Sequence, residues 1–246
     1  MKMLIAIGVL ILSAVMATTS GQNTKLKKPY EQWTATEVTQ ILSDSQWART
    51  NLKITGERPG SDASNYPPET NFFVQIRLYS ARPIRQALVR RMHLTIPYAD
   101  LTVTQRGSFD AEVDGLLKCP QCAENYIVTL SSGPGDRLKL VSGSSSVMVD
   151  VVALMKRVPE DELVRHVSLL NDKGERRTAT RVLTTKKNEL VFLFPRFDDQ
   201  RKPLITVSNK KFYLDFDEYL SRKAEGALKK FKFDVIDLVQ DGEVMF

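Results

Sequence analysis

Hydrophobic and polar residues alternate most regularly from residue 72 to residue 79, and this alternation predicts a β-strand. One face of the strand would carry Phe72, Val74, Ile76 and Leu78. A helix is predicted to follow from Ala81 to about Met92, because apolar residues there recur every three or four positions. The polar side of this helix carries Arg82, Arg85 and Arg90. We interpret these arginines as a solvated face first and as an anion-binding face second.

An earlier helix is predicted to begin at Thr34, where Thr34 and Glu37 form a capping-box pattern. In such a box, each of the two side chains satisfies a free backbone amide at the start of the helix. Trp33 precedes this cap, and Trp47 follows the helix in what is predicted to be a second short turn. Both tryptophans are interpreted as core residues or as staples that fix the helix start. The alternative hypothesis is that they dock onto a partner or onto sugar rings.

The two cysteines of the chain stand close together, in the sequence Cys119-Pro-Gln-Cys122. A helix predicted at about 110–118 leads straight into them, and a strand is predicted at 127–130. A redox-active pair of this spacing belongs at the start of a helix, where the dipole lowers the pKa of the first thiol. Because the helix here ends at the pair, we interpret the cysteines as a local structural disulfide. A thiol-disulfide redox site and a metal site are the alternatives.

From residue 163 onward, the pattern changes to short strands separated by turns. Residues 164–170 and 176–184 predict a β-hairpin around the turn Asn171-Asp172-Lys173-Gly174. Further strands are predicted at 189–194, 204–207, 212–216, 231–238 and 244–246. Earlier in the chain, residues 138–141 are predicted to pair with 127–130, and residues 146–156 fit either a helix or a strand.

Together these elements predict an α+β fold. A mixed N-terminal region would hold two or three helices, and a C-terminal region would resemble an antiparallel β-sandwich, with a loose division at about residue 158. Residues 55–71 have the composition of a flexible loop. The predicted regions are 22–54 (a leader and the first helix), 55–71 (the loop), 72–158 (mixed α+β) and 159–246 (β-rich).

Residues 1–21 are predicted to be a cleavable secretory signal peptide. Lys2 precedes an apolar run of about 15 residues, and small residues follow from Ala17 to Gly21. The pattern fits cleavage before Thr18 or before Gln22. An uncleaved anchor is the alternative, although this run is shorter than the ~20 residues that a membrane span needs. No later segment is apolar enough to cross a bilayer, so the mature protein is predicted to be exported, to the periplasm or beyond.

Composition limits the class of partner. Hydrophobic residues make up 42% of the chain, which excludes general disorder. The chain has 35 Lys and Arg against 29 Asp and Glu, which gives a net charge of +6. This basic excess is moderate and is mixed with acids throughout. It suggests weak contact with an anionic surface, and it does not point to nucleic acid.

Three short stretches resemble uncharacterised exported bacterial proteins. They are Lys28-Pro29-Tyr30-Glu31-Gln32-Trp33, the later Ser45-Gln46-Trp47-Ala48, and the β-rich tail at 239–246. The resemblance implies an envelope or secreted location. It carries over no catalytic residue, because no chemistry is attached to these motifs.

The sequence shows no established catalytic motif. His93 and His166 are its two histidines, and neither lies in a catalytic-triad context or near a nucleophile elbow. In the β-rich region, Asp215, Asp217 and Glu218 could together present oxygen ligands. Alternation along the predicted strand puts the first two of them on its exposed face. No metal site or cofactor is predicted. Paired carboxylates for glycan hydrolysis stay open, because their separation is set in three dimensions.

The sequence therefore favours an exported, non-enzymatic protein that binds or scaffolds other envelope components through its β-sandwich. The expected partner is an envelope protein or a glycan. The alternative is an exported enzyme, either a thiol-disulfide redox protein that uses Cys119 and Cys122 or a carboxylate-based glycan hydrolase. A deep cleft with convergent acids, or an exposed Cys119, would favour the enzyme.

The signal peptide predicts where the mature protein starts. N-terminal sequencing of protein recovered from producing cells is expected to read from Thr18 or Gln22, because signal peptidase cuts after small residues. As a control, Ala17→Phe combined with Gly21→Phe is expected to block both cuts and preserve the full-length chain. Recovery of the unaltered protein with Met1 in place, bound to membranes, would contradict cleavage and favour an anchor.

Overall fold

The alternating segment near residue 72 becomes the second strand of the larger of two sheets. The computed structural model describes residues 28–55, 70–132 and 147–246. In the larger sheet, sheet A, the strands follow in the order β1 (Ala48–Thr55), β2 (Thr70–Leu78), β3 (Asn125–Ser131), β8 (Leu190–Pro195) and β7 (Arg181–Thr184). Each neighbouring pair in this order is antiparallel. A short strand, β4 (Val147–Val149), pairs in parallel with the first residues of β2.

The smaller sheet, sheet B, is antiparallel throughout. Its order is β10 (Lys230–Asp234), β9 (Lys211–Phe216), β5 (Val167–Asn171) and β6 (Arg176–Thr178). β5 and β6 form the first part of the predicted hairpin, with Leu169 opposite Arg177. Its predicted second strand, 176–184, is divided, because residues 181–184 form β7 of sheet A. Gly174 lies in the hairpin turn at φ 85°, a conformation that other residues rarely adopt. A small ribbon of β11 (Val239–Gln240) and β12 (Glu243–Val244) follows sheet B.

The main hydrophobic core fills the space between the sheets and contains residues from Trp33 to Phe246. Its largest fully buried aromatic side chains are Tyr126, Phe192, Phe194, Phe212 and Phe233. Phe192 of sheet A meets Phe216 of sheet B edge to face, with ring centres 5.9 Å apart. The predicted α+β fold is confirmed, with N-terminal helices followed by antiparallel sheets that pack in the C-terminal half.

The loose division at residue 158 does not separate two packing units. β3 lies before this residue and β8 lies after it, yet the two strands pair from Asn125 opposite Pro195 to Leu130 opposite Leu190. The mixed region and the β-rich region therefore share a sheet as well as a core.

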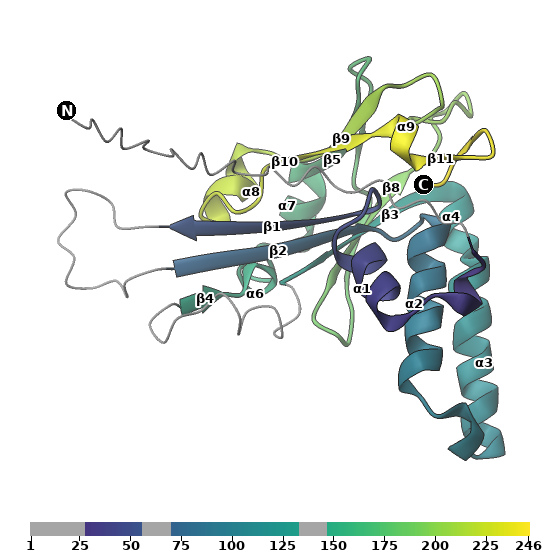
Figure 1. Cartoon of the computed structure of the whole chain (residues 1–246). Coiled ribbons are helices and arrows are strands. Elements are labelled where there is room, and N and C mark those ends of the chain that lie inside the picture. The colour runs from purple at the N-terminus through teal and green to yellow at the C-terminus, as the bar shows by residue number, and fades with distance from the viewer. Residues whose placement is uncertain (1–27, 56–69, 133–146) are drawn as a thin grey trace, which may run out of the picture.

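Along the sequence, most of the helices lie between strands. In the described residues they are α1 (Ala35–Ser43), α2 (Arg82–Thr95), α3 (Val103–Lys118), α4 (Pro120–Glu124), α6 (Val151–Met155), α7 (Glu160–His166), α8 (Glu218–Lys223) and α9 (Val235–Leu238), with 3-10 turns η1 (Tyr30–Gln32) and η2 (Tyr98–Asp100). α1 begins at the predicted capping box, in which the carboxylate of Glu37 accepts the Thr34 amide at 2.7 Å. α2 and α3 form a hairpin that projects from the sheets (Figure 1).

Some element types differ from the prediction. Residues 164–166, predicted as the start of a strand, instead end a helix that spans 160–166, because Pro159 and three acidic residues of the first turn favour a helix start. His166 therefore ends a helix. Residues 204–207 form no strand, and residues 235–238 form a helical turn after β10. The short turn predicted at Trp47 and Ala48 is found at Gln46 and Trp47, and β1 begins directly after it, at Ala48.

Other predictions fall partly or wholly outside the described residues. Residues 146–156 include both predicted types, with β4 followed by α6. The predicted strand at 138–141 and the signal peptide at 1–21 lie outside the described residues, as does most of the loop at 55–71. Of the helices that the structure describes, none is long and apolar enough to cross a membrane.

The two tryptophans lie in the core. Trp33 and Trp47 are each 3% exposed, and the indole nitrogen of Trp33 donates to the Lys28 carbonyl at 3.1 Å. Neither ring reaches the surface, so the docking alternative for these residues does not fit the structure. The interpretation as core residues does.

Arg77 of β2 joins sheet A to the end of α1, and its loss is expected to destabilise the fold. Its guanidinium donates to the Leu42 carbonyl at 2.8 Å and to Glu189 at 3.0 Å. Removing one partner of a fully buried pair costs ~3–5 kcal/mol. Because Glu189 is partly exposed, we expect Arg77→Met to lower the free energy of unfolding by about 2–3 kcal/mol, measured by urea denaturation.

The exposed pair between Arg201 and Glu124 is the matched control, and Arg201→Met is expected to leave the free energy of unfolding almost unchanged, because solvent screens an exposed ion pair. Equal losses from the two variants would show that burial of the Arg77 pair contributes nothing.

Candidate functional site

The α2–α3 hairpin is the most distinctive feature on the surface of the protein. The chain leaves sheet A after β2 and returns in β3, where Leu78 lies opposite Val128. The first half of α2 is buried, with Val89 as its last buried residue. No residue from Arg90 to Ser108 is buried, so this part of the hairpin stands clear of the body (Figure 1).

The far end of the hairpin is ordered around one aromatic residue. Phe109 is the buried residue of α3, and it packs edge to face against His93 at 5.0 Å and Tyr98 at 5.3 Å between ring centres. Thr102 caps α3 through a reciprocal box with Gln105. The two helices therefore meet through a small apolar contact of their own.

Hydrogen bonds fix the turn between the helices. The hydroxyl of Tyr98 donates to Asp110 at 3.0 Å, and this bond is the main reason that the pKa of Tyr98 is raised. Arg106 donates to the Ala99 carbonyl at 2.6 Å, and its guanidinium lies over the Tyr98 ring. Asp110 and Arg106 of α3 thus hold the turn from Pro97 to Leu101 in place.

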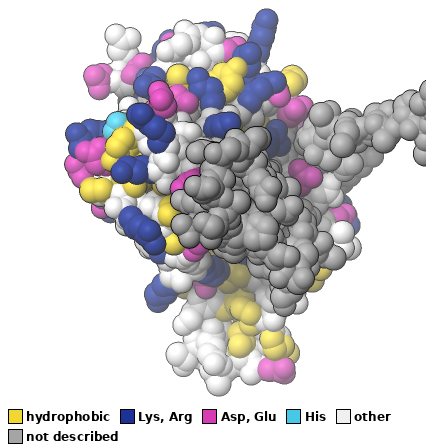
Figure 2. Space-filling view, turned by 90° about the vertical axis from the view of Figure 1, so that its left-hand side faces the viewer, with side chains coloured by type: hydrophobic (Ala, Val, Ile, Leu, Met, Phe, Trp, Pro, Cys, Tyr) yellow, Lys and Arg dark blue, Asp and Glu magenta, His cyan; other side chains and the backbone are white. Residues whose placement is uncertain are grey.

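Large hydrophobic side chains are exposed at this end. Leu94 is 42% exposed, Tyr98 37% and Val103 87%. Elsewhere in the described residues, the exposed large hydrophobics are Leu183, Val207 and Ile236, which come from three separate elements or loops. Figure 2 shows the hairpin as the lower lobe of the molecule, with hydrophobic side chains gathered on it and the Lys and Arg side chains above it. We call residues 92–105 the hairpin end.

Arg85 holds the base of the hairpin. Its guanidinium donates to the carbonyls of Leu116 (3.1 Å) and Leu117, in the last turn of α3. A cation at the C-terminus of a helix is stabilised by the dipole and by the carbonyls that lack helical partners. Burial lowers the pKa of Arg85, yet arginine remains charged at any working pH.

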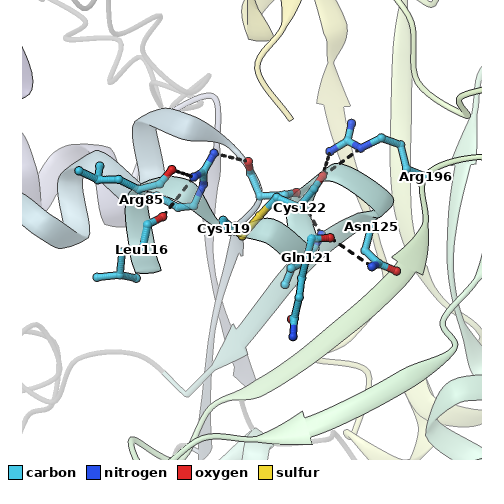
Figure 3. The surroundings of a disulfide bond; sticks show 10 residues. Arg85, Leu116, Cys119, Gln121, Cys122, Asn125 and Arg196 are labelled. Atoms are coloured by element: carbon cyan, nitrogen blue, oxygen red, sulfur yellow. Dashed lines mark hydrogen bonds between the residues drawn. A yellow bond between two sulfur atoms is a disulfide. The ribbon is translucent and has the colours of Figure 1, made fainter. Parts of the chain in front are cut away.

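The disulfide lies immediately beyond this anchor (Figure 3). Cys119 ends α3 in the left-handed conformation, at φ 39°, and also precedes α4. Its Cα lies 5.4 Å from that of Cys122, within the range that a disulfide requires. Each cysteine is 8% exposed, and the pair packs with Ile127 and Leu193 on sheet A. The predicted disulfide is therefore present.

A second arginine holds the end of α4. Arg196, which follows β8, donates to the Cys122 carbonyl through two nitrogens, at 3.2 and 3.0 Å (Figure 3). Its guanidinium also lies over the ring of Tyr126, 4.2 Å from the centre. The turn that carries the disulfide is thus fixed to sheet A.

The three arginines predicted to share one solvated face do different things. Arg82 is exposed, Arg85 is buried at the end of α3, and Arg90 donates to the Trp33 carbonyl at 2.8 Å. The prediction of a common face is wrong for Arg85, because its side chain is used inside the protein to hold carbonyls from residues far along the chain.

The histidines and acids from the sequence lie in two places. His93 belongs to the hairpin end. His166 bonds through Nδ1 to Asp217 at 2.5 Å and through Nε2 to Glu162 at 3.1 Å, and it stacks on Tyr219. Among the residues with described positions, no group of three or more His, Cys, Asp or Glu could hold a metal ion.

The remaining acids near this site have structural partners. Asp215 lies on the face of β9 opposite to the buried Leu214 and Phe216, as predicted, but its side chain is only 15% exposed and pairs with Arg176 at 3.1 Å. Asp217 caps α8 by accepting the amides of Tyr219 and Leu220. Glu218, in the first turn of α8, lies 3.9 Å from Arg222.

The hairpin end was missed at the sequence level. A signal was present: from Met92 to Gln105 the chain holds no Lys or Arg and one acid, Asp100. Exposed helix ends are usually charged, so a stretch of this composition is informative only once its exposure is known.

No family model, curated protein or solved structure matches the chain. Its function is therefore inferred from the geometry described above.

Loss of Arg85 is expected to loosen the base of the hairpin. Arg85→Met leaves the carbonyls of Leu116 and Leu117 without a donor, which costs about 1–3 kcal/mol of stability. Hydrogen exchange is expected to accelerate in the last turn of α3, before any change in the sheets. Arg82→Met, at an exposed position of the same helix, is the control and is expected to leave exchange unchanged. Equal protection in both variants would contradict the anchor.

Loss of the disulfide is expected to have a modest effect. The bond closes a very short loop, so it contributes less than the ~3 kcal/mol of a 15-residue loop. The double variant Cys119→Ser, Cys122→Ser is expected to fold with a small fall in melting temperature. The unaltered oxidised protein should show no free thiol and should not reduce insulin. Rapid alkylation of Cys119 at neutral pH, together with insulin reduction, would instead indicate a redox catalyst.

Proposed function

We propose that the protein is an exported, non-enzymatic binding protein of the cell envelope, and that it docks through the hairpin end. The observation that carries this proposal is the exposure of Leu94, Tyr98 and Val103 together on a projecting, ordered element. The sequence favoured binding through the β-sandwich. The projecting hairpin is the better candidate, because it presents apolar side chains away from the body.

The order of the hairpin supports a docking role. Apolar surface left in water costs free energy, and a contiguous exposed patch is typical of an interaction site. The contacts of Tyr98 with Phe109 and Asp110 hold the ring of Tyr98 in place before a partner arrives. A preorganised surface loses less conformational entropy on binding than a flexible loop does.

The surroundings of the disulfide support a structural role over a redox role. Both cysteines are buried against sheet A, where a substrate thiol has poor access. Cys119 lies at the C-terminus of the sixteen-residue helix α3, whose negative dipole end disfavours a thiolate. The positive end of α4 opposes this effect, but α4 has only five residues.

In the described residues, Glu162 and Asp217 are two carboxylates from different elements that both bind His166. They bind opposite nitrogens of the same imidazole, so the ring of His166 lies between them. A hydrolase needs that space for the glycosidic bond and, in inverting enzymes, for water. The arrangement supports a role for the acids in holding His166.

Export rests on the sequence of residues 1–21, and the disulfide agrees with it. Structural disulfides persist in oxidising compartments and are rare in the cytosol. An envelope location would also bring the hairpin end close to membranes, wall polymers and other exported proteins.

Fractionation of producing cells tests the proposal. We define a hairpin-end variant with Leu94→Ser, Tyr98→Ser and Val103→Ser. Its envelope-bound fraction is expected to fall about tenfold, because three apolar contacts are removed. The matched control replaces Leu183, Val207 and Ile236 with Ser, which removes exposed apolar side chains of the body. Equal retention of the two variants, or turnover of a substrate that depends on His166, would contradict the proposal.

A further inference from the structure

We propose that the surface bound by the hairpin end is a lipid bilayer with anionic headgroups. This inference rests on the proposed function and names the partner of the same site. It is carried by two features found together: an apolar end that holds no Lys or Arg and one acid, Asp100, and a collar of arginines on the side of that end facing the body.

The collar consists of Arg90, Arg91 and Arg106. Helices rise 1.5 Å per residue, so Arg90 and Arg91 lie about 5–6 Å from Leu94 along α2. Arg106 is three residues from Val103 and lies about 5 Å from it along α3. An element lying in the interface buries its apolar side chains ~5–10 Å into the boundary between headgroups and acyl chains. With the apolar residues at this depth, the arginines are level with the phosphates.

The collar arginines have charge available for an external anion. Arg90 donates one bond to the Trp33 carbonyl, and Arg106 donates one to the Ala99 carbonyl. In the described part of the chain, none of the three arginines is in an ion pair with a carboxylate. By contrast, Arg77 and Arg201 each have a carboxylate partner. Guanidinium groups bind phosphate oxygens through several donors at once.

The hairpin end also fits a shallow position in the membrane. Tyr98 is amphipathic, and tyrosine is enriched at the interface between lipid and water. Asp100 lies in the turn at the tip and is exposed, so its carboxylate opposes entry into hydrocarbon and approach to anionic lipid. The depth is therefore limited to the headgroup layer, and binding is reversible.

Charge also favours lipid over a second copy of the chain as the partner of the hairpin end. An end-to-end contact of two hairpins would be symmetric, and it would place the arginine collar of one copy close to that of the other. Like charges brought together in this way repel. An anionic membrane has the opposite charge and offers it over a continuous surface.

Co-sedimentation of the mature protein with vesicles tests the inference. Vesicles of phosphatidylcholine mixed with phosphatidylglycerol are expected to bind the protein at low salt, and vesicles of phosphatidylcholine alone are expected to bind it far more weakly. Each juxtamembrane arginine contributes about a fivefold factor, so Arg91→Gln is expected to weaken binding about fivefold. Arg222→Gln, an exposed change on the body, is the charge control and is expected to bind as the unaltered protein does.

Asp100→Asn gives a test in the opposite direction. Removing this carboxylate is expected to strengthen binding to anionic vesicles about fivefold, because one repulsive charge is lost. A merely damaged hairpin would not bind more tightly. The hairpin-end variant with Ser at 94, 98 and 103 is expected to lose at least about tenfold in affinity, with its circular dichroism unchanged.

The outcomes separate this inference from the proposed function. Equal binding to neutral and anionic vesicles would overturn the anionic-lipid assignment, and so would binding that ignores both Arg91→Gln and Asp100→Asn. If vesicles are not bound but envelope retention still needs the hairpin end, a protein partner replaces the lipid and the proposed function stands. If neither vesicle binding nor retention depends on the hairpin end, both fail.

Discussion

The arrangement of this protein depends on one kind of interaction. Buried or half-buried arginines donate hydrogen bonds to the carbonyls at the carboxyl ends of helices. Arg77 binds the carbonyl of Leu42 at the end of α1, Arg85 binds the end of α3, and Arg196 binds the end of α4. Each guanidinium comes from a distant part of the chain. The helix ends gain donors for carbonyls that lack helical partners, and the arginines gain a dipole that stabilises their charge. Part of the basic excess is thus internal to the fold.

The position of the hairpin follows from sheet topology. Because β2 and β3 are antiparallel neighbours, β2 ends and β3 begins at the same end of sheet A, and the chain must leave and rejoin the sheet there. Two antiparallel helices satisfy this requirement, since they carry the chain out and return it to its starting point. The same neighbours place α4 and the disulfide directly before β3, so the base of the hairpin and the centre of the sheet are fixed together.

The sequence predicted the elements that depend on local signals. The capping box at Thr34, the alternation in β2 and the turn at Gly174 are all readable from residues within a few positions of one another. Contacts between distant residues could not be predicted from the sequence. Examples are the pairing of β3 with β8 and the hydrogen bonds from Arg85 to carbonyls at the far end of α3. The disulfide was predicted because its cysteines are adjacent in sequence. The hairpin end was missed because a stretch with few charges becomes a site only through exposure.

The part of the hairpin that stands clear of the body has an electrostatic consequence. α2 continues six residues beyond its last buried residue, Val89, and at 1.5 Å per residue this adds about 9 Å. The Debye length at physiological salt is about 8 Å. Whatever the hairpin end touches is thus about one screening length from the charges of the two sheets. A change in the body's surface charge is therefore felt only weakly at the hairpin end, where the charges of nearby residues dominate.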